Sequence, residues 1–71
     1  MSHQEATMLN IYGENVTLTS AQKREYVALL YGPASPDWRS TQHKVLERLV
    51  DKGLVKITLV IANVTRFERW M

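Results

Sequence analysis

The sequence predicts a single small α+β domain made of a short strand, two main helices and a C-terminal β-hairpin. Two segments carry apolar residues at helical spacing and are bounded by residues that start and stop helices. After Gly53 the apolar spacing changes from helical to alternating, which indicates strands. A chain of 71 residues can build only one core. We expect residues 1–15 to form an N-terminal segment, frayed or a short strand, and residues 16–71 to form the domain.

The first helix is expected over residues 20–31. A short β-like run, Val16–Leu18, precedes it. Thr19 and Gln22, three residues apart, match a capping box, in which each side chain bonds a free backbone N–H of the helix start. Gly32 can take the left-handed conformation that ends a helix, and the proline after it cannot continue one. The expected buried stripe consists of Tyr26, Val27, Leu29 and Leu30.

The second helix carries stronger signals and ends at Gly53. Ser35 is a candidate N-cap, Pro36 suits the first helical position, and Asp37 places a negative charge near the positive end of the helix dipole. At 100° per residue the core stripe comprises Trp38, Gln42, Val45, Leu46 and Leu49. The opposite, polar side comprises Ser40, Lys44, Glu47 and Asp51. Gln42 is therefore the one polar residue expected on the core face.

The segment after Gly53 predicts a hairpin. Alternation places Val55, Ile57, Leu59 and Ile61 on one face, Ala62 and Asn63 form the turn, and the following residues form the partner strand, in which Phe67 is expected to pack under the sheet. A two-residue loop pairs Leu59 with Arg66, whereas a three-residue loop pairs it with Phe67. The second register is favoured because it joins apolar to apolar.

Composition limits the classes of function. The chain has no cysteine, which excludes disulfides and thiolate metal ligands. Its longest apolar run, Leu59–Ala62, is too short for a bilayer, and its first residues lack a signal-peptide pattern, so we expect a soluble cytoplasmic protein. The net charge of +2 divides into −2 for residues 1–38 and +4 for residues 39–71. An anionic partner should therefore meet the second half.

Residues 40–55, "STQHKVLERLVDKGLV", carry a resemblance to a known family. With the order strand, helix, helix, hairpin, they resemble the recognition helix and the start of the wing in small MarR-like winged helix-turn-helix regulators. The resemblance covers about residues 16–70 and implies a compact winged-helix-like fold. It also implies a recognition helix in the major groove, a hairpin wing on the flanking DNA backbone or minor groove, and a homodimer.

Two features depart from the family pattern. The family has a short middle helix before the recognition helix, and "GPASPDW", residues 32–38, leaves little room for one. Either that helix is reduced to a turn, or the recognition helix begins late, near Ser40, with residues 36–39 as a vestige. Gln42 stands where the family has an aliphatic residue that packs against the middle helix. The two departures are consistent, because an aliphatic residue at position 42 would have no middle helix to pack against.

The candidate DNA contacts lie at the start of the recognition helix. Arginine can bond guanine with two hydrogen bonds, and Ser, Thr and Lys can bond base or phosphate. The candidates in and near the helix are Arg39, Ser40, Thr41, His43, Lys44 and Arg48, and the candidate wing contacts to the DNA backbone are Asn63 and Arg66. For each basic residue alone, an ordinary solvated role is the alternative. Tyr31 and Trp70 are candidates for a dimer or partner surface, although Trp70 could instead complete the core.

The expected function is that of a small non-enzymatic protein that binds double-stranded DNA and regulates transcription. Its only histidines are His3 and His43, and no glycine-rich phosphate loop is present, so we expect neither a metal nor another cofactor. The alternative is a reduced winged-helix module that binds another protein as an adaptor or inhibitor, because Glu47 and Asp51 share the exposed helix face. Short chains of this kind are common among phage and mobile-element products.

Overall fold

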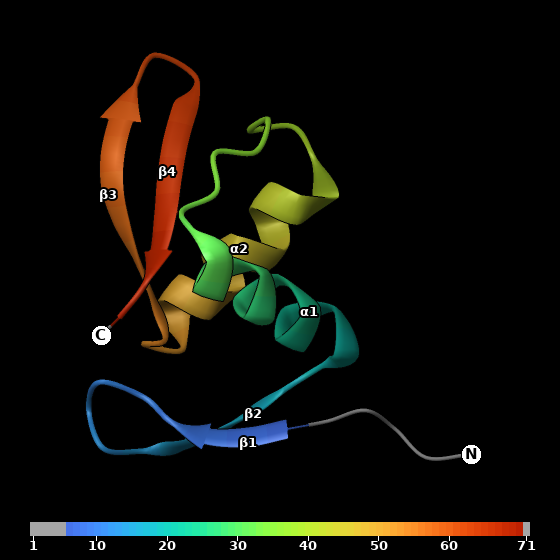
Figure 1. Cartoon of the computed structure of the whole chain (residues 1–71), viewed down its shortest axis with the longest axis vertical. Coiled ribbons are helices and arrows are strands. Elements are labelled where there is room, and N and C mark those ends of the chain that lie inside the picture. Colours follow the sequence, from blue (N-terminus) through green and yellow to red (C-terminus); the bar gives the residue numbers. More distant parts are fainter. Residues whose placement is uncertain (1–5, 71) are drawn as a thin grey trace.

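The structure is a computed structural model and describes residues 6–70 (Figure 1). The expected α+β class is confirmed: two helices combine with two antiparallel hairpins, one of them C-terminal. The β1–β2 hairpin crosses one end of the molecule, and the β3–β4 hairpin rises beside the helices toward the other end (Figure 1). In chain order the elements are β1 (Ala6–Leu9), β2 (Asn15–Leu18), α1 (Ser20–Ala28), the 3-10 turn η1 (Leu29–Tyr31), α2 (Thr41–Asp51), β3 (Val55–Ile61) and β4 (Val64–Arg69).

One hydrophobic core joins the two helices to the β3–β4 hairpin. Burying such side chains is the main favourable term in the folding of so short a chain. Phe67 of β4 is fully buried, as the sequence predicted. The fully or almost fully buried apolar residues are Leu18, Leu29, Leu46, Leu49, Leu54, Val55 and Phe67.

The first helix begins where the sequence predicts. The Thr19 hydroxyl accepts the backbone N–H of Gln22 at 3.2 Å, and the Gln22 side chain accepts the N–H of Thr19 at 3.0 Å, which confirms the capping box. The chain tightens into η1 for its last turn and ends at Gly32, whose φ of 145° favours glycine. The expected stripe was wrong for Val27 and Leu30, which are exposed because the buried side of the helix faces α2 and β2.

The second helix begins at Thr41, with Ser40 as its N-cap, so the expected start at Ser35 was wrong. The physical reason is a backbone pairing: Ala34 and Phe67 exchange two hydrogen bonds, of 3.0 and 2.8 Å, and Asp37 forms a bridge to Val64. The chain before Ser40 is therefore extended along the outer edge of β4. Residues 32–40 hold no helix, in agreement with the late start that the sequence offered as an alternative.

The buried face of α2 is rotated from the expected one. Leu46 and Leu49 are buried as predicted, but Gln42 is exposed and His43 is buried in its place. The reason is the arrangement of neighbours. Phe67 of β4 packs against His43, whereas residues 32–40 supply no helix that could cover Gln42. Trp38 lies before the helix and is exposed, so its expected place on the core stripe was also wrong.

The β3–β4 hairpin closes through the two-residue turn Ala62–Asn63, and the favoured three-residue register was wrong. Leu59 pairs with Arg66, whereas Phe67 pairs with Ile57. A β-bulge between Ile57 and Leu59 makes both pairings compatible with a two-residue turn. Because paired residues share a face, the bulge also moves Leu59 and Ile61 to the face opposite Val55 and Ile57.

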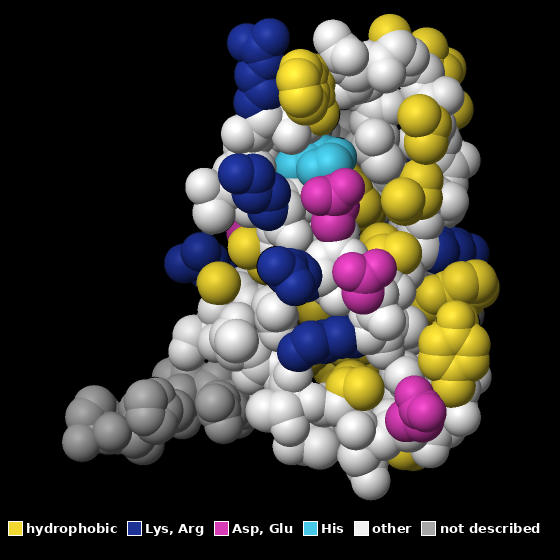
Figure 2. All heavy atoms as spheres, turned by 180° about the vertical axis from the view of Figure 1, so that it is seen from behind, with side chains coloured by type: hydrophobic (Ala, Val, Ile, Leu, Met, Phe, Trp, Pro, Cys, Tyr) yellow, Lys and Arg dark blue, Asp and Glu magenta, His cyan; other side chains and the backbone are white. Residues whose placement is uncertain are grey.

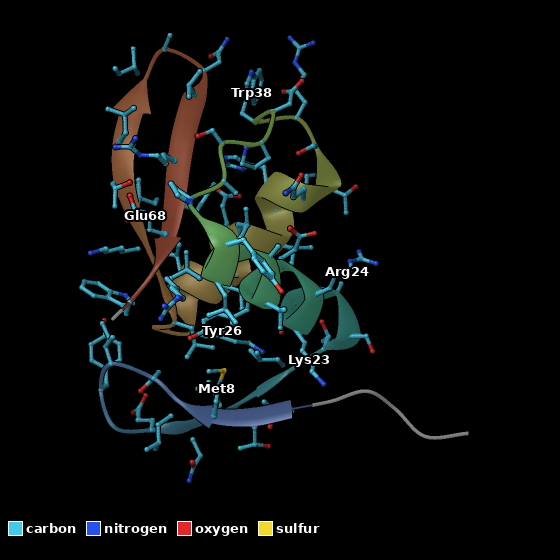
Figure 3. All side chains as sticks on the ribbon, in the orientation of Figure 1. Met8, Lys23, Arg24, Tyr26, Trp38 and Glu68 are labelled. Atoms are coloured by element: carbon cyan, nitrogen blue, oxygen red, sulfur yellow. The ribbon has the colours of Figure 1, made fainter. Side chains whose placement is uncertain are left out.

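The sequence did not predict the N-terminal hairpin as such. The side chain of Asn10 organises its turn: its Oδ1 accepts the backbone N–H groups of Tyr12 and Glu14, both at 2.9 Å. Its Nδ2 donates to the carbonyl of Lys52 at 2.8 Å, which fastens the turn to the end of α2. Met8 of β1 and Tyr26 of α1 fill the space between the hairpin and the helices (Figure 3).

Candidate nucleic-acid interface

The structure sorts the basic residues of the second half into two groups. Four are half-buried, and three of these contact other parts of the chain: Lys52 bonds the carbonyl of Thr17 and the side chain of Gln22, Lys56 lies over Trp70, and Arg66 pairs with Glu68. The other three are exposed and form no ion pair with any residue that the structure describes. These are Arg39, Lys44 and Arg48.

The three exposed basic residues belong to α2 and the turn that precedes it. Lys44 and Arg48 are one helical turn apart on the side of α2 opposite Leu46 and Leu49. Lys and Arg side chains run down this face of the molecule, with acidic side chains beside them (Figure 2). The acidic residues of α2, Glu47 and Asp51, come later in the helix, so positive charge is most concentrated toward its N-terminus.

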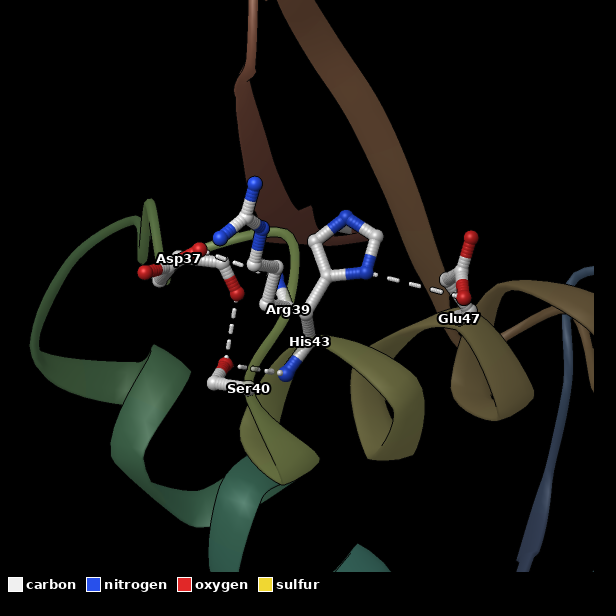
Figure 4. A network of polar contacts seen from close by, with 5 residues as sticks. All are labelled: Asp37, Arg39, Ser40, His43 and Glu47. Atoms are coloured by element: carbon white, nitrogen blue, oxygen red, sulfur yellow. Dashed lines mark hydrogen bonds and ion pairs between the residues drawn. The ribbon is translucent and has the colours of Figure 1, made fainter.

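A polar network fixes the turn in front of α2 (Figure 4). The Asp37 carboxylate accepts the backbone N–H of Arg39 at 2.9 Å, and the Asp37 carbonyl accepts both the N–H and the hydroxyl of Ser40, at 2.9 and 2.6 Å. The Ser40 hydroxyl in turn accepts the N–H of His43 at 3.1 Å. Both hydrogen-bonding roles of this hydroxyl are used inside the protein. Ser40, a candidate DNA contact in the sequence, therefore acts as a helix cap.

Trp38 and Arg39 project from this turn, with the Arg39 guanidinium over the indole. The guanidinium carbon of Arg39 lies 4.9 Å from the centre of a Trp38 ring, within the range of a cation–π interaction. Trp38 is 45% exposed and lies at the end of the molecule that also holds the hairpin turn (Figure 3). Reasoning from the sequence missed Trp38 as a surface residue. The signal that could have revealed it is Ser40 as the N-cap, which leaves Trp38 outside the helix.

His43 must be withdrawn from the candidate contacts, because it is only 8% exposed. Its ring meets that of Phe67 edge to face, with centres 5.2 Å apart. Its Nδ1 lies 3.6 Å from Oε1 of Glu47, which is longer than a hydrogen bond, and its Nε2 is buried with no hydrogen-bond partner within residues 6–70. The imidazole therefore packs in the interface between α2 and the hairpin. Thr41, by contrast, is exposed in the first turn of α2.

The two wing candidates occupy different positions. Asn63 is exposed at the tip of the hairpin, where a neighbouring molecule could reach it. Arg66 is half-buried: its Nε donates to Oγ1 of Thr58 at 3.1 Å and lies 3.7 Å from the carboxylate of Glu68. Since Arg66 alternates with buried Phe67, it also lies on the face of the hairpin turned away from α2. Of the two, only Asn63 is exposed.

Tyr31 and Trp70, the residues suggested for a dimer or partner surface, line different grooves. Tyr31 is 90% exposed at the end of η1. Trp70 is partly covered: Lys56 lies over its ring, and its backbone N–H reaches the carbonyl of Leu54 at 3.3 Å. Trp70 also lines a groove of about 330 Å³ together with the N-terminal turn, β3 and the end of α2.

Both faces of the hairpin carry exposed apolar side chains. Ile57 and Val60 lie on the face of Phe67, whereas Ile61 and Val64 lie on the opposite face beside the turn. Each of the four is between 46% and 65% exposed, and hydrophobic side chains gather over the side of the molecule that holds the hairpin (Figure 2). Exposed apolar clusters of this kind often mark contact surfaces.

Within residues 6–70, no group of histidine and acidic side chains could hold a metal ion, and no helix has the length and apolar character needed to cross a bilayer. Comparison with protein-family models, with curated proteins and with solved structures found no match.

Proposed function

We propose that this protein binds double-stranded DNA through α2 and the turn before it, and that it regulates transcription without catalysing a reaction. The observation that carries the proposal is the group of three exposed basic side chains, Arg39, Lys44 and Arg48, which have no acidic partner among the described residues. Charges left free in this way can neutralise phosphates and release their counterions, which is the main source of protein–DNA affinity.

The dimensions of α2 suit the major groove. Its 11 residues form a helix about 16 Å long, and a helix with side chains fits a groove about 12 Å wide. Glu47 and Asp51 come after Lys44, so the helix would enter with its N-terminal end, where the local charge is positive. The hairpin tip with Asn63 would then lie against the flanking backbone, as the wing does in the family that the sequence resembles.

Salt dependence tests this proposal directly. Counterion release by these three basic side chains predicts that affinity for a random duplex falls roughly 40-fold between 50 and 200 mM salt. Lys44→Glu should weaken binding strongly, because it replaces an attractive charge with a repulsive one at the start of the helix. The matched control is Lys23→Glu, which makes the same charge change on an exposed position of α1. Equal effects of the two substitutions, or no binding at 50 mM salt, would exclude α2 as the interface.

The hairpin gives a specific reason for a second candidate function, an adaptor or inhibitor that binds a protein. Its four exposed apolar residues offer no chemistry for phosphates, and Glu47 and Asp51 reduce the positive charge of the neighbouring helix. This candidate predicts that Val60→Lys abolishes partner binding while Lys44→Glu does not. Sedimentation across a range of protein concentrations tests whether the partner is a second copy of the chain, as the homodimer implied by the family resemblance requires.

A further inference from the structure

Trp38 is placed in a way that the core does not explain. It is 45% exposed, although burial of a side chain of this size would stabilise the fold considerably. The turn that carries it is fixed on both sides: Asp37 is held by its bridge to Val64 in β4, and Ser40 is held by its bonds to Asp37 and His43. The backbone that carries Trp38 is therefore held in place next to the start of α2.

The contact between Trp38 and Arg39 restricts the arginine. A free arginine side chain samples many rotamers, and ordering it on binding costs conformational entropy. The contact with the indole, with the guanidinium carbon 4.9 Å from the ring centre, favours rotamers that keep the guanidinium over the ring before any ligand arrives. The Arg39 side chain makes no hydrogen bond or ion pair with the described part of the chain, so its donors remain available. Trp38 lies at the same end of the molecule as the hairpin tip (Figure 3).

We propose that Trp38 is a positioning residue that orients Arg39 for two parallel hydrogen bonds to the O6 and N7 atoms of a guanine in the major groove. This inference rests on the proposed DNA-binding function and adds a base preference to it. Phosphate contacts need charge but little orientation, and the exposed Lys44 and Arg48 supply that charge. A guanine edge requires the planar, two-donor geometry of an arginine, which a lysine cannot reproduce. Lys44 and Arg48 in α2 thus supply affinity for any DNA sequence, whereas Arg39 in the preceding turn recognises a base.

The test is a selection from a pool of duplexes with a random core, at a salt concentration where the wild-type protein retains DNA. The wild type should enrich a motif that contains a guanine, and replacing that guanine should lower affinity about tenfold. Trp38→Ala should lose most of this tenfold preference while retaining binding to random duplex. Trp38→Phe should retain the preference, because a phenyl ring still accepts a guanidinium on its face. Arg39→Lys should lose the preference but keep the salt dependence, because the charge is unchanged.

Fluorescence gives an independent readout. The chain contains only two tryptophans, so Trp70→Phe leaves Trp38 as the single indole reporter. Its emission should change when the selected duplex is added and should change less with a duplex that lacks the guanine. Circular dichroism and thermal melting of each variant verify that the fold is retained, as the exposure of Trp38 and Arg39 leads us to expect.

The outcomes separate the two proposals. Failure of the wild type to retain any duplex at low salt would overturn both the DNA-binding function and the guanine contact. Salt-dependent binding without an enriched guanine would leave DNA binding intact and overturn the reading by Arg39. A guanine motif that Trp38→Ala selects as strongly as the wild type does would overturn the positioning role of Trp38.

Discussion

Replacing His43 with leucine should make the protein more stable. The imidazole is 8% exposed, and its Nε2 is buried without a hydrogen-bond partner among the described residues. A buried polar atom without a partner costs about 1–3 kcal/mol, and leucine removes that cost. The substitution also removes the edge-to-face contact with Phe67, and such an aromatic pair contributes about 0.5–1.5 kcal/mol. The difference favours leucine by roughly 1 kcal/mol.

Thermal and urea unfolding measure this change. For a domain of this size, a gain of 1 kcal/mol should raise the Tm by roughly 4–8 °C. The DNA affinity of the His43→Leu variant should remain within about twofold of wild type, since a buried side chain cannot reach a base. Leu46→Ala provides the opposite control on the same face, because removing a fully buried leucine side chain costs about 2–5 kcal/mol.

Two results would refute this reasoning about His43. A clear loss of stability would mean that the imidazole nitrogens make favourable interactions that the contacts described above do not include. A large loss of DNA affinity with unchanged stability would mean that His43 faces the ligand after all, as the sequence alone suggested.

Three further substitutions test how the elements are joined. Asn10→Ala should lower the free energy of unfolding by about 1 kcal/mol in urea titrations, because the exposed N–H of Tyr12 and the part-buried carbonyl of Lys52 lose their hydrogen bonds to Asn10; unchanged stability would mean that the N-terminal turn is not fastened to α2. Gly53→Ala should cost about 1–2 kcal/mol in thermal melting, since Gly53 has a φ of 79° and a new Cβ would lie 3.0 Å from the ring of Tyr12; a neutral result would contradict that backbone conformation. Ser40→Ala should cost about 1 kcal/mol of stability, whereas Ser40→Asp should retain the cap, and equal losses in both would argue against Ser40 as the N-cap.

Local rules in the sequence determined the elements that depend on neighbours along the chain. The capping box of Thr19 and Gln22 sets the start of α1 through hydrogen bonds that span only three residues. The polar positions Lys44, Glu47 and Asp51 of α2 are exposed because helical periodicity alone separates them from Leu46 and Leu49. The turn at Ala62–Asn63 and the burial of Phe67 were also predicted from the alternating pattern and the turn residues.

The tertiary structure decided the features that depend on contacts between distant segments. The start of α2 moved to Ser40 because the backbone of Ala34 pairs with Phe67, a partner 33 positions away that no local pattern reveals. The same packing of β4 buries His43, leaves Gln42 in solvent and places Trp38 and Arg39 on the surface. The sequence could therefore identify the basic helix and its fold class, whereas only the packing of β4 could decide which of its side chains are free to meet a ligand.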